Sequence, residues 1–165
     1  MKRLLVLLFT VALSGCATLH EPLPPDFKGP IVRVTDTGYT EDRSKAQFFV
    51  LQEVDGKAIN NSIFESRKAS HGRGFALTTI YITRGLPATP MKIKLLGTHQ
   101  TAAPIHEIAS RAAGTFFSVE GVVDFTPIPG RDYFVRGELK KEGSSVWLED
   151  ATSNQPATDK VHSKR

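Results

Sequence analysis

The segment Ser70-His71-Gly72-Arg73-Gly74 combines residue types that can bind an anion. Its two glycines can let backbone N–H groups converge on an anion, and Arg73 and His71 add positive charge. The segment differs from a phosphate-binding P-loop, because the glycine spacing is different and no Lys-Ser or Lys-Thr pair follows. Two interpretations therefore stay open: a candidate ligand or anion loop, or a flexible connection that leads into the next strand.

The remaining polar residues do not form a recognisable catalytic or metal-binding motif. Of the five histidines, only His99 and His106 are near one another in sequence, and they straddle a predicted loop rather than share a helix face. The serines are not accompanied by a Gly-x-Ser-x-Gly motif, and the neighbouring carboxylates Glu149 and Asp150 point to opposite faces of a predicted strand. We therefore predict no catalytic residues, no metal and no cofactor, and expect that the protein is not an enzyme.

Trp147 is the only tryptophan. An exposed indole can act as an aromatic platform for a sugar or a peptide, whereas a buried one covers roughly 150–250 Å² between two sheets. We expect Trp147 to lie in the core.

The first sixteen residues have the order of a secretory signal. Lys2 and Arg3 precede a mostly apolar run over residues 4–13, and the small residues Ser14 and Gly15 lead to Cys16. The apolar run is too short to cross roughly 30 Å of hydrocarbon, which takes about 20 helical residues. The order of charge, apolar run and small residues predicts a segment that is removed from the mature protein.

The residues Leu13-Ser14-Gly15-Cys16 resemble the lipobox of bacterial lipoproteins. The resemblance implies that the Cys16 thiol takes a diacylglycerol, that a type II signal peptidase cuts before Cys16, and that the new amino group is acylated with a fatty acid such as palmitate. Several acyl chains anchor a protein stably, whereas one chain holds only marginally. Cys16 is also the only cysteine, so an internal disulfide and a cysteine-built zinc site are excluded.

The residue after Cys16 bears on the membrane to which the protein is sorted. In lipoproteins of enteric Gram-negative bacteria, an aspartate at this position retains the protein in the inner membrane, and this chain has Ala17 instead. The resemblance therefore favours the outer membrane, with the protein facing the periplasm. In a host with one membrane, the same anchor would lie in the outer leaflet of the cytoplasmic membrane.

Residues 16–30 contain four prolines, at positions 22, 24, 25 and 30. Proline fixes its own φ and biases the preceding residue toward extended geometry, which predicts a semi-rigid spacer of up to roughly 40 Å at about 3.1 Å per residue. We accordingly divide the chain into a signal peptide over residues 1–15, a Pro-rich tether over residues 16–30 and one domain over residues 31–165 with a frayed C-terminal tail.

Alternation of apolar and polar residues predicts short strands throughout the domain. The expected strands cover residues 31–37, 47–54, 75–83, 91–95, 117–125, 133–139 and 145–150, with a short last strand near 157–161. Asp55-Gly56 is a hairpin signal, although the polar sequence after it makes a weak partner strand. Further turns are expected at Pro129-Gly130 and Glu142-Gly143.

One short helix is predicted within residues 102–114. Ile105, Ile108, Ala109 and Ala112 fall at helical spacing, Pro104 suits a first turn and Gly114 suits a C-terminal cap. Residues 60–74 are interpreted as either a long loop or a helical turn. The expected fold is mainly β: an antiparallel β-sandwich of transthyretin-like or immunoglobulin-like form with one short helix, after an N-terminal signal helix.

The charge pattern bears on the class of partner. The chain has 21 basic and 17 acidic residues, and the lysines do not form a stripe interleaved with aromatic residues, so we predict no nucleic-acid binding. We predict a lipid-anchored cell-envelope module that binds or scaffolds an envelope protein or polymer without catalysis. Two alternatives stay open: an envelope hydrolase with His71 or His99 as general base, and a small-ligand carrier with a pocket between its sheets.

Overall fold

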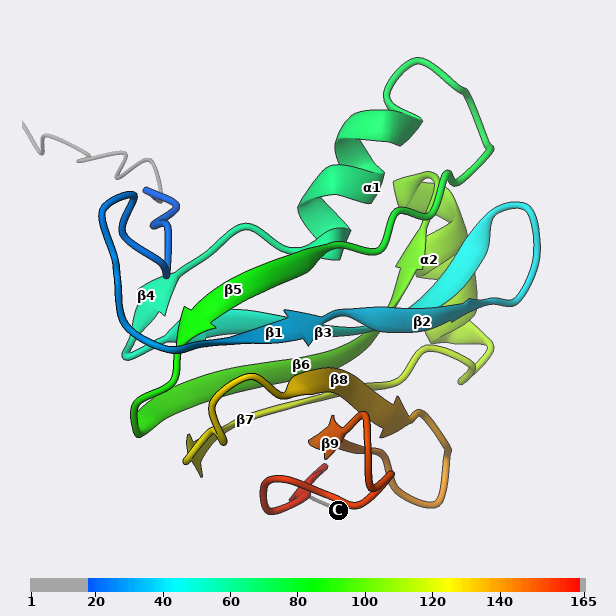
Figure 1. Ribbon diagram of the computed structural model, residues 1–165. Helices are drawn as coiled ribbons and strands as arrows, with labels where there is room; N and C mark the ends of the chain where they lie inside the picture. The colour runs from blue at the N-terminus through cyan, green and yellow to red at the C-terminus, as the bar shows by residue number, and fades with distance from the viewer. Residues whose placement is uncertain (1–17, 164–165) are drawn as a thin grey trace, which may run out of the picture.

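The computed structural model describes residues 18–163, so the signal segment and Cys16 lie outside the described residues. Within that range the chain is mainly β, with ten strands in two open sheets and two helices. Both helices lie against the same sheet (Figure 1). None of the helices in the described range is long and apolar enough to span a bilayer.

Sheet I has the strand order β10-β9-β8-β1-β5. Its strands are β1 (Ile31–Thr35), β5 (Thr83–Pro87), β8 (Asp132–Glu138), β9 (Ser145–Asp150) and β10 (Val161–His162). Neighbouring strands are antiparallel except β1 and β8, which are parallel. The expectation of purely antiparallel pairing is wrong there, because a long connection through the other sheet separates the two strands and lets β8 arrive in the direction of β1.

Sheet II has the strand order β2-β3-β6-β7, and β4 pairs with the end of β3. Its strands are β2 (Thr37–Thr40), β3 (Lys45–Val54), β4 (Lys57–Ala58), β6 (Met91–Thr101) and β7 (Ser118–Phe125). The Asp55-Gly56 hairpin is confirmed: both residues have positive φ, 47° and 74°, and Val54 pairs with Lys57 across the turn. Its second strand is only two residues long, as its polar sequence indicated.

The main hydrophobic core lies between the two sheets and draws on both. Tyr133 of β8 and Phe125 of β7 meet there edge to face, with ring centroids 5.0 Å apart. Trp147 does not join them, so our expectation of a core tryptophan is wrong. Its neighbours Val146 and Leu148 take the inward positions of β9, which leaves Trp147 half-buried on the outer face, with Lys160 Nζ 3.9 Å from its ring centroid.

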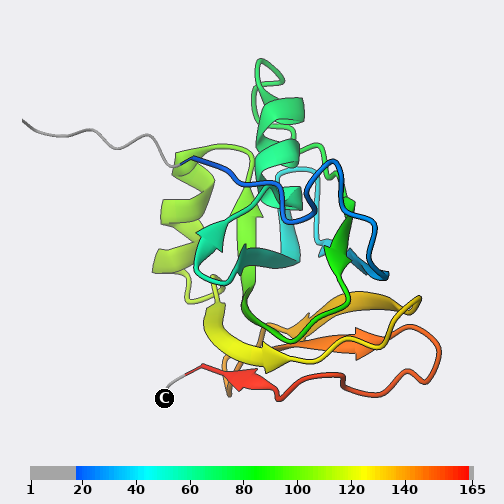
Figure 2. The ribbon, with the colours of Figure 1, turned by 60° about the vertical axis from the view of Figure 1, so that its left-hand side comes forward.

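A second apolar cluster lies on the other face of sheet II. Ala46, Phe48 and Val50 of β3 pack there against Ile63 of α1 (Ser62–Ser70). The apolar residues on both faces of β3 fit its position inside the sheet, as the sequence predicted. Figure 2 shows α1 and α2 (Pro104–Ala112) side by side on this covered face.

Helix α1 occupies the range that the sequence left open between a loop and a helical turn. Asn61 is its N-cap, and the side chain of Asn61 accepts hydrogen bonds from the N–H groups of Ile63 and Phe64 at 3.0 and 3.3 Å. The buried face of α1 includes Ser62 and Ser66 beside Ile63, so the helix lacks a continuous apolar stripe that would reveal it.

The strand expected over residues 75–83 is wrong except at its last residue, Thr83, where β5 begins. The segment instead runs along α1 and bonds to serine side chains. The hydroxyl oxygens of Ser62, Ser66 and Ser70 accept the backbone N–H groups of Ile82, Ile80 and Thr78 at 3.0, 2.8 and 2.9 Å. Because a helix brings residues four apart onto one face, these serines satisfy alternate N–H groups that a neighbouring strand would otherwise pair. We call this set of contacts the serine ladder.

Helix α2 confirms the helix predicted within residues 102–114. Pro104 lies in its first turn and Gly114 has the positive φ of 66° typical of a residue just after a helix. Its apolar residues face solvent, with Ile105 59% and Ile108 62% exposed, so α2 does not add an apolar face to the core.

The N-terminal segment lies against the body instead of extending from it. The N–H of His20 donates to the carbonyl of Ala58 at 2.8 Å, and Leu23 contacts β5 at Gly85. Cys16 is only four residues before His20, a span of at most about 14 Å. The reach is therefore much shorter than the roughly 40 Å expected for a free spacer. The segment joins the body at the β4 end of sheet II, whereas α2 follows the opposite end of β6 (Figure 1).

Candidate functional site

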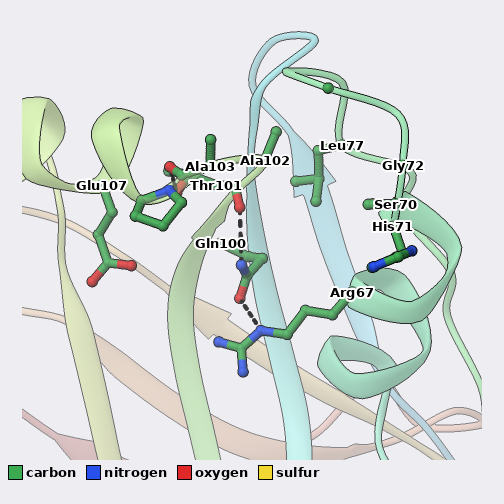
Figure 3. Close-up of a pocket in the computed structure, with 12 residues that line it drawn as sticks. Arg67, Ser70, His71, Gly72, Leu77, Gln100, Thr101, Ala102, Ala103 and Glu107 are labelled. Atoms are coloured by element: carbon green, nitrogen blue, oxygen red, sulfur yellow. Dashed lines mark hydrogen bonds between the residues drawn. The ribbon is translucent and has the colours of Figure 1, made fainter.

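Two adjoining clefts lie between α1 and α2 on the outer face of sheet II. Their volumes are about 440 and 310 Å³, and both are lined by Arg67, Gln100 and Glu107. We call them together the inter-helix groove, and Figure 3 shows the larger one. Clefts of this size are in the range that takes small molecules or a segment of a polymer.

The floor of the groove is a row of side chains on the sheet that is polar except for Leu96. Leu96, Thr98 and Gln100 alternate with inward-facing residues along β6, and Ser118 lies beside Thr98 on β7. The backbone of β6 pairs with β3 on one side and with β7 on the other, and β7 is the outer strand of the sheet.

Charged groups from both helices face the groove. Arg67 Nε of α1 donates to Gln100 Oε1 at 3.1 Å, and Gln100 Nε2 donates to the carbonyl of Thr101 at 3.0 Å (Figure 3). On α2, Arg111 Nη2 pairs with Glu107 Oε1 at 2.8 Å across one turn. Because that pair is internally neutral, Arg67 supplies the uncompensated charge among these three ionised side chains.

Aromatic and apolar side chains complete the smaller cleft. Ile63 and Phe64 come from α1, and Phe116 lies after α2 with the Arg111 guanidinium carbon 3.9 Å from its ring centroid. Phe64 is 44% exposed, which leaves its ring accessible to a ligand. The cleft therefore combines aromatic rings with amide and hydroxyl groups.

Gln52 is the unusual residue of the smaller cleft. It is the extra residue of a β-bulge, since Leu51 pairs with Leu95 and Glu53 pairs with Lys94. Its Oε1 atom is buried and has no hydrogen-bond partner in the part of the chain that the structure describes. A buried acceptor without a partner costs about 1–3 kcal/mol, so it needs an explanation.

A buried ion pair fixes the start of α1 and with it one wall of the groove. Asp36 is fully buried and bonds to both Arg84 guanidinium ends, with Nη1–Oδ1 at 2.9 Å and Nη2–Oδ2 at 2.6 Å. Its two oxygens also accept the N–H groups of Leu51 and Ser62, at 3.0 and 2.9 Å. One carboxylate therefore links β5, β3 and the first residue of α1.

His99 lies under the groove and contacts Glu41, with Nε2 2.9 Å from Oε1. Its Nδ1 lies 3.0 Å from the backbone nitrogen and 3.2 Å from the carbonyl oxygen of Phe117. Both ring nitrogens are thus occupied, and His99 has no nitrogen free to take a proton from a substrate. The contact between His99 and Phe117 links β6 to the residue that precedes β7.

Several groups act together on the Glu41 carboxylate. Burial raises its pKa, but hydrogen bonds from Gln47, Lys45 and His99 outweigh that effect, and the pKa of Glu41 lies below its usual value. Glu41 is therefore an anion that receives hydrogen bonds at neutral pH. It is not a protonated acid available for catalysis.

The structure brings part of the candidate loop Ser70–Gly74 to the groove. Ser70, His71, Gly72 and Gly74 line the larger cleft. Ser70 also belongs to the serine ladder, and its hydroxyl donates to the carbonyl of Ser66 at 2.7 Å. The loop follows the C-terminal end of α1, where unpaired carbonyls carry partial negative charge and disfavour an anion. Arg73 is exposed and does not line either cleft. An anion-binding role for this loop stays a prediction.

Sequence reasoning missed most groove residues. Gln52, Arg67, Gln100, Glu107 and Arg111 come from four separate elements, and only the fold brings them together. The N-cap Asn61 was an available signal for α1, but the positions of Arg67 and Gln52 relative to β6 depend on long-range pairing.

Comparison of the chain with protein-family models, curated protein sequences and solved structures finds no match. The lipobox residues Leu13, Ser14, Gly15 and Cys16 lie outside the described residues.

Proposed function

We propose that this protein is a lipid-anchored protein of the cell envelope that binds another envelope component in the inter-helix groove, without catalysis. The anchor is the lipid on Cys16. The membrane is the outer membrane, facing the periplasm, or the outer leaflet of the cytoplasmic membrane in a host with one membrane. The observation that carries the binding role is the groove, in which Arg67, Gln52 and the Phe64 ring face a cleft between the helices.

The short connection to the anchor supports a body held close to the bilayer. His20 is already bonded to Ala58, four residues after Cys16. The groove extends toward α2, which follows the end of β6 opposite the N-terminal segment. On a lipid anchor, this arrangement would hold the body at the membrane and leave the α2 end available to a polymer or protein in the envelope.

A second part of the proposal concerns how the two sheets pack against each other. We propose that the two sheets form a β-sandwich related to transthyretin-like or immunoglobulin-like forms, with β1 and β8 as a parallel exception. A single buried cluster that includes Val34 of sheet I and Leu51 of sheet II supports this layering. Because the same cluster occupies the space between the sheets, it argues against the alternative of a small-ligand carrier with a pocket there.

An envelope hydrolase is the second candidate. The contact between His99 and Glu41 favours it, because a carboxylate beside a histidine is a common feature of general-base catalysis. The occupied Nδ1 of His99 and its 4% exposure favour a structural role instead. If a His99→Gln variant that keeps its fold lost a measured envelope-polymer cleavage activity, the non-catalytic proposal would be wrong.

Site-specific photo-cross-linking in living cells tests the binding proposal. A photoreactive phenylalanine analogue replaces Phe64 at the rim of the groove, and in a matched control it replaces Tyr39, which is 65% exposed and does not line the groove. The proposal predicts a cross-linked envelope protein or polymer from position 64 only. Equal products from both positions, or none from position 64, would contradict it.

A further inference from the structure

We propose that helix α2 is a second membrane contact, whose apolar face rests on the bilayer that holds the lipid anchor. This inference goes beyond the binding role of the groove, and it rests on the part of the proposed function that places a lipid on Cys16. It begins from α2 itself, which has no buried residue although it carries two isoleucines.

The apolar face of α2 is reversed relative to an ordinary surface helix. Its members share one side of the helix and are all exposed: Ile105, Ile108, Ala109 and Ala112. A surface helix normally turns such a stripe toward the core. Here the stripe faces solvent in the part of the chain that the structure describes, and apolar surface gathered in this way is typical of a protein or membrane contact. We call it the outward face of α2.

Phe75 extends this apolar surface beyond the start of α2. Its ring centroid lies 5.2 Å from that of His106, the residue after Ile105, and Phe75 is 66% exposed. An aromatic side chain beside aliphatic ones is a composition found on helices that lie in the membrane interface.

The groove lies on another side of α2. Glu107 and Arg111 are one turn apart, line the smaller cleft and pair with each other. At 3.6 residues per turn, their side of the helix is well away from that of Ile105 and Ile108. A surface that contacts the outward face therefore does not occupy the groove, and both contacts can form together.

The start of the chain brings the lipid to the same side of the molecule. The described chain begins at Thr18, two residues after Cys16, which is a reach of at most about 7 Å. Figure 1 separates this start from α2 along the sheets, whereas Figure 2 shows both at the same edge of the molecule. One flat surface at that edge can touch both. A bilayer that holds the lipid on Cys16 is such a surface.

A second copy of the chain fits the outward face less well. Helix α2 has nine residues and is about 14 Å long. A stable interface buries about 800 Å² on each partner, which such a short helix does not supply alone. A bilayer contact needs less affinity, because the lipid anchor already holds the body at the bilayer and makes the contact intramolecular.

The charges of α2 indicate a contact that does not depend on anionic lipid. Glu107 and Arg111 are its one acidic and one basic residue, and they pair at 2.8 Å. The contact would come from apolar side chains that enter the interface rather than from attraction between cations and headgroups. We therefore expect little dependence on headgroup charge or salt concentration.

Contact quenching in lipid vesicles tests the inference with the full lipidated chain. Cys16 is the only cysteine, and its lipid leaves an introduced cysteine as the single free thiol for a fluorescent label. The label is attached in an Ala112→Cys variant and, as a control, in a Gln155→Cys variant, in the turn after β9 at the opposite edge of Figure 2. The vesicles contain brominated phosphatidylcholine, which quenches a fluorophore that touches the acyl chains.

We expect quenching at position 112 to be about threefold greater than at position 155, because only the outward face reaches the acyl chains. Added phosphatidylglycerol or high salt should not change this result. Equal quenching at the two positions, or none at position 112, would overturn the inference. Quenching that disappears at high salt would also overturn it, since the contact would then be electrostatic.

A double substitution assigns the contact to the outward face. Ile105→Ser with Ile108→Ser should reduce quenching at position 112 to the level of position 155, whereas Tyr39→Ser, at an exposed position on β2, should not. Circular dichroism checks that both variants keep their fold. Unchanged quenching in the folded double variant would overturn the assignment.

Other results identify other occupants or a failure of the anchor. Disulfide-linked dimers of unlabelled Ala112→Cys chains without quenching would assign the outward face to a second copy and overturn the inference. The intact mass shows whether Cys16 carries lipid. A lipidated chain that sediments with vesicles but is not quenched at position 112 makes only this inference wrong. A chain without lipid that stays in solution makes the proposed anchor wrong, and the inference fails with it.

Discussion

The hydroxyl oxygen of Ser66 accepts the backbone N–H of Ile80 at 2.8 Å and also lies 3.2 Å from the carbonyl oxygen of Ile80, to which it donates. One serine of α1 thus satisfies both backbone groups of a residue in the extended segment before β5. With Ser62 and Ser70, it attaches that segment to α1, which forms one wall of the groove.

The serine ladder is expected to contribute measurably to stability. Ser66→Ala leaves two partly buried backbone groups of Ile80 without their serine partner, and the better helix propensity of alanine offsets only about 0.5 kcal/mol of the loss. We expect the free energy of unfolding to fall by about 1–2 kcal/mol in urea denaturation. Ser110→Ala on α2 is the matched control, since the Ser110 hydroxyl has no hydrogen bond within residues 18–163, and it should be neutral or slightly stabilising. Equal changes in the free energy of unfolding for the two substitutions would contradict a stabilising role of the serine ladder.

The Asp36–Arg84 ion pair should be far more important than an exposed one. Asp36→Asn leaves the guanidinium of Arg84 buried without a compensating charge, which costs about 3–5 kcal/mol of unfolding free energy. The exposed pair Arg33–Asp132 provides the control, and Asp132→Asn should lower the free energy of unfolding far less, because solvent screens an exposed pair. Chemical denaturation of both variants measures the contrast. If the two variants lost similar free energies of unfolding, Asp36 would not organise the start of α1.

Because the apolar residues of α2 face solvent, we expect substitutions there to change the free energy of unfolding little. Ile108→Ala should change the free energy of unfolding by no more than about 0.5 kcal/mol, because Ile108 is largely exposed. Ile63→Ala on α1 should cost about 2–4 kcal/mol, because Ile63 packs against Phe48 and Val50 in the second cluster. Thermal and urea unfolding compare the two. A large loss from Ile108→Ala would place that face of α2 in the core.

Asp150 should make stability depend on pH in the acid range. The backbone N–H of Ser153 and the Arg131 guanidinium hold its pKa at about 2, against the ordinary 3.8. A carboxylate whose pKa is lower in the folded state stabilises fully above its unfolded pKa, and that contribution is lost as the pH falls from about 4 toward 2. Asp150→Asn should lower stability at neutral pH and make the decline in this window shallower.

Urea denaturation as a function of pH measures that effect. Asp26→Asn is the control, since Asp26 is exposed and its side chain has no hydrogen bond in the described structure. Its pH profile should follow that of the wild type. A profile for Asp150→Asn that is parallel to the wild type from pH 2 to 4 would contradict the role of Asp150.

The elements that the sequence predicted well are those with strong local signals. Alternation placed Ile93 and Leu95 of β6 on the inward face, and Pro104 and Gly114 marked the ends of α2. Helix α1 was harder to recognise because serines occupy much of its buried face, so apolar periodicity gave no clear helical signal.

The features that depend on long-range contacts could not be read locally. Val146, Trp147 and Leu148 are all apolar, so the run does not reveal which face Trp147 occupies, and sheet pairing decides it. The parallel contact of β1 with β8 joins segments about 100 residues apart. Gln52 likewise gains its place in the groove from a bulge that only the pairing with β6 creates.

The measurement that tests the central claim most directly is fatty-acid labelling of Cys16. Cells that express the wild type or Cys16→Ser are grown with a clickable palmitate analogue and fractionated, and the intact mass of each purified protein is determined. We predict a labelled wild type that sediments with membranes and begins at an acylated Cys16, and an unlabelled Cys16→Ser variant. A wild type that begins at Met1 with a free thiol and stays in the soluble fraction would contradict the account.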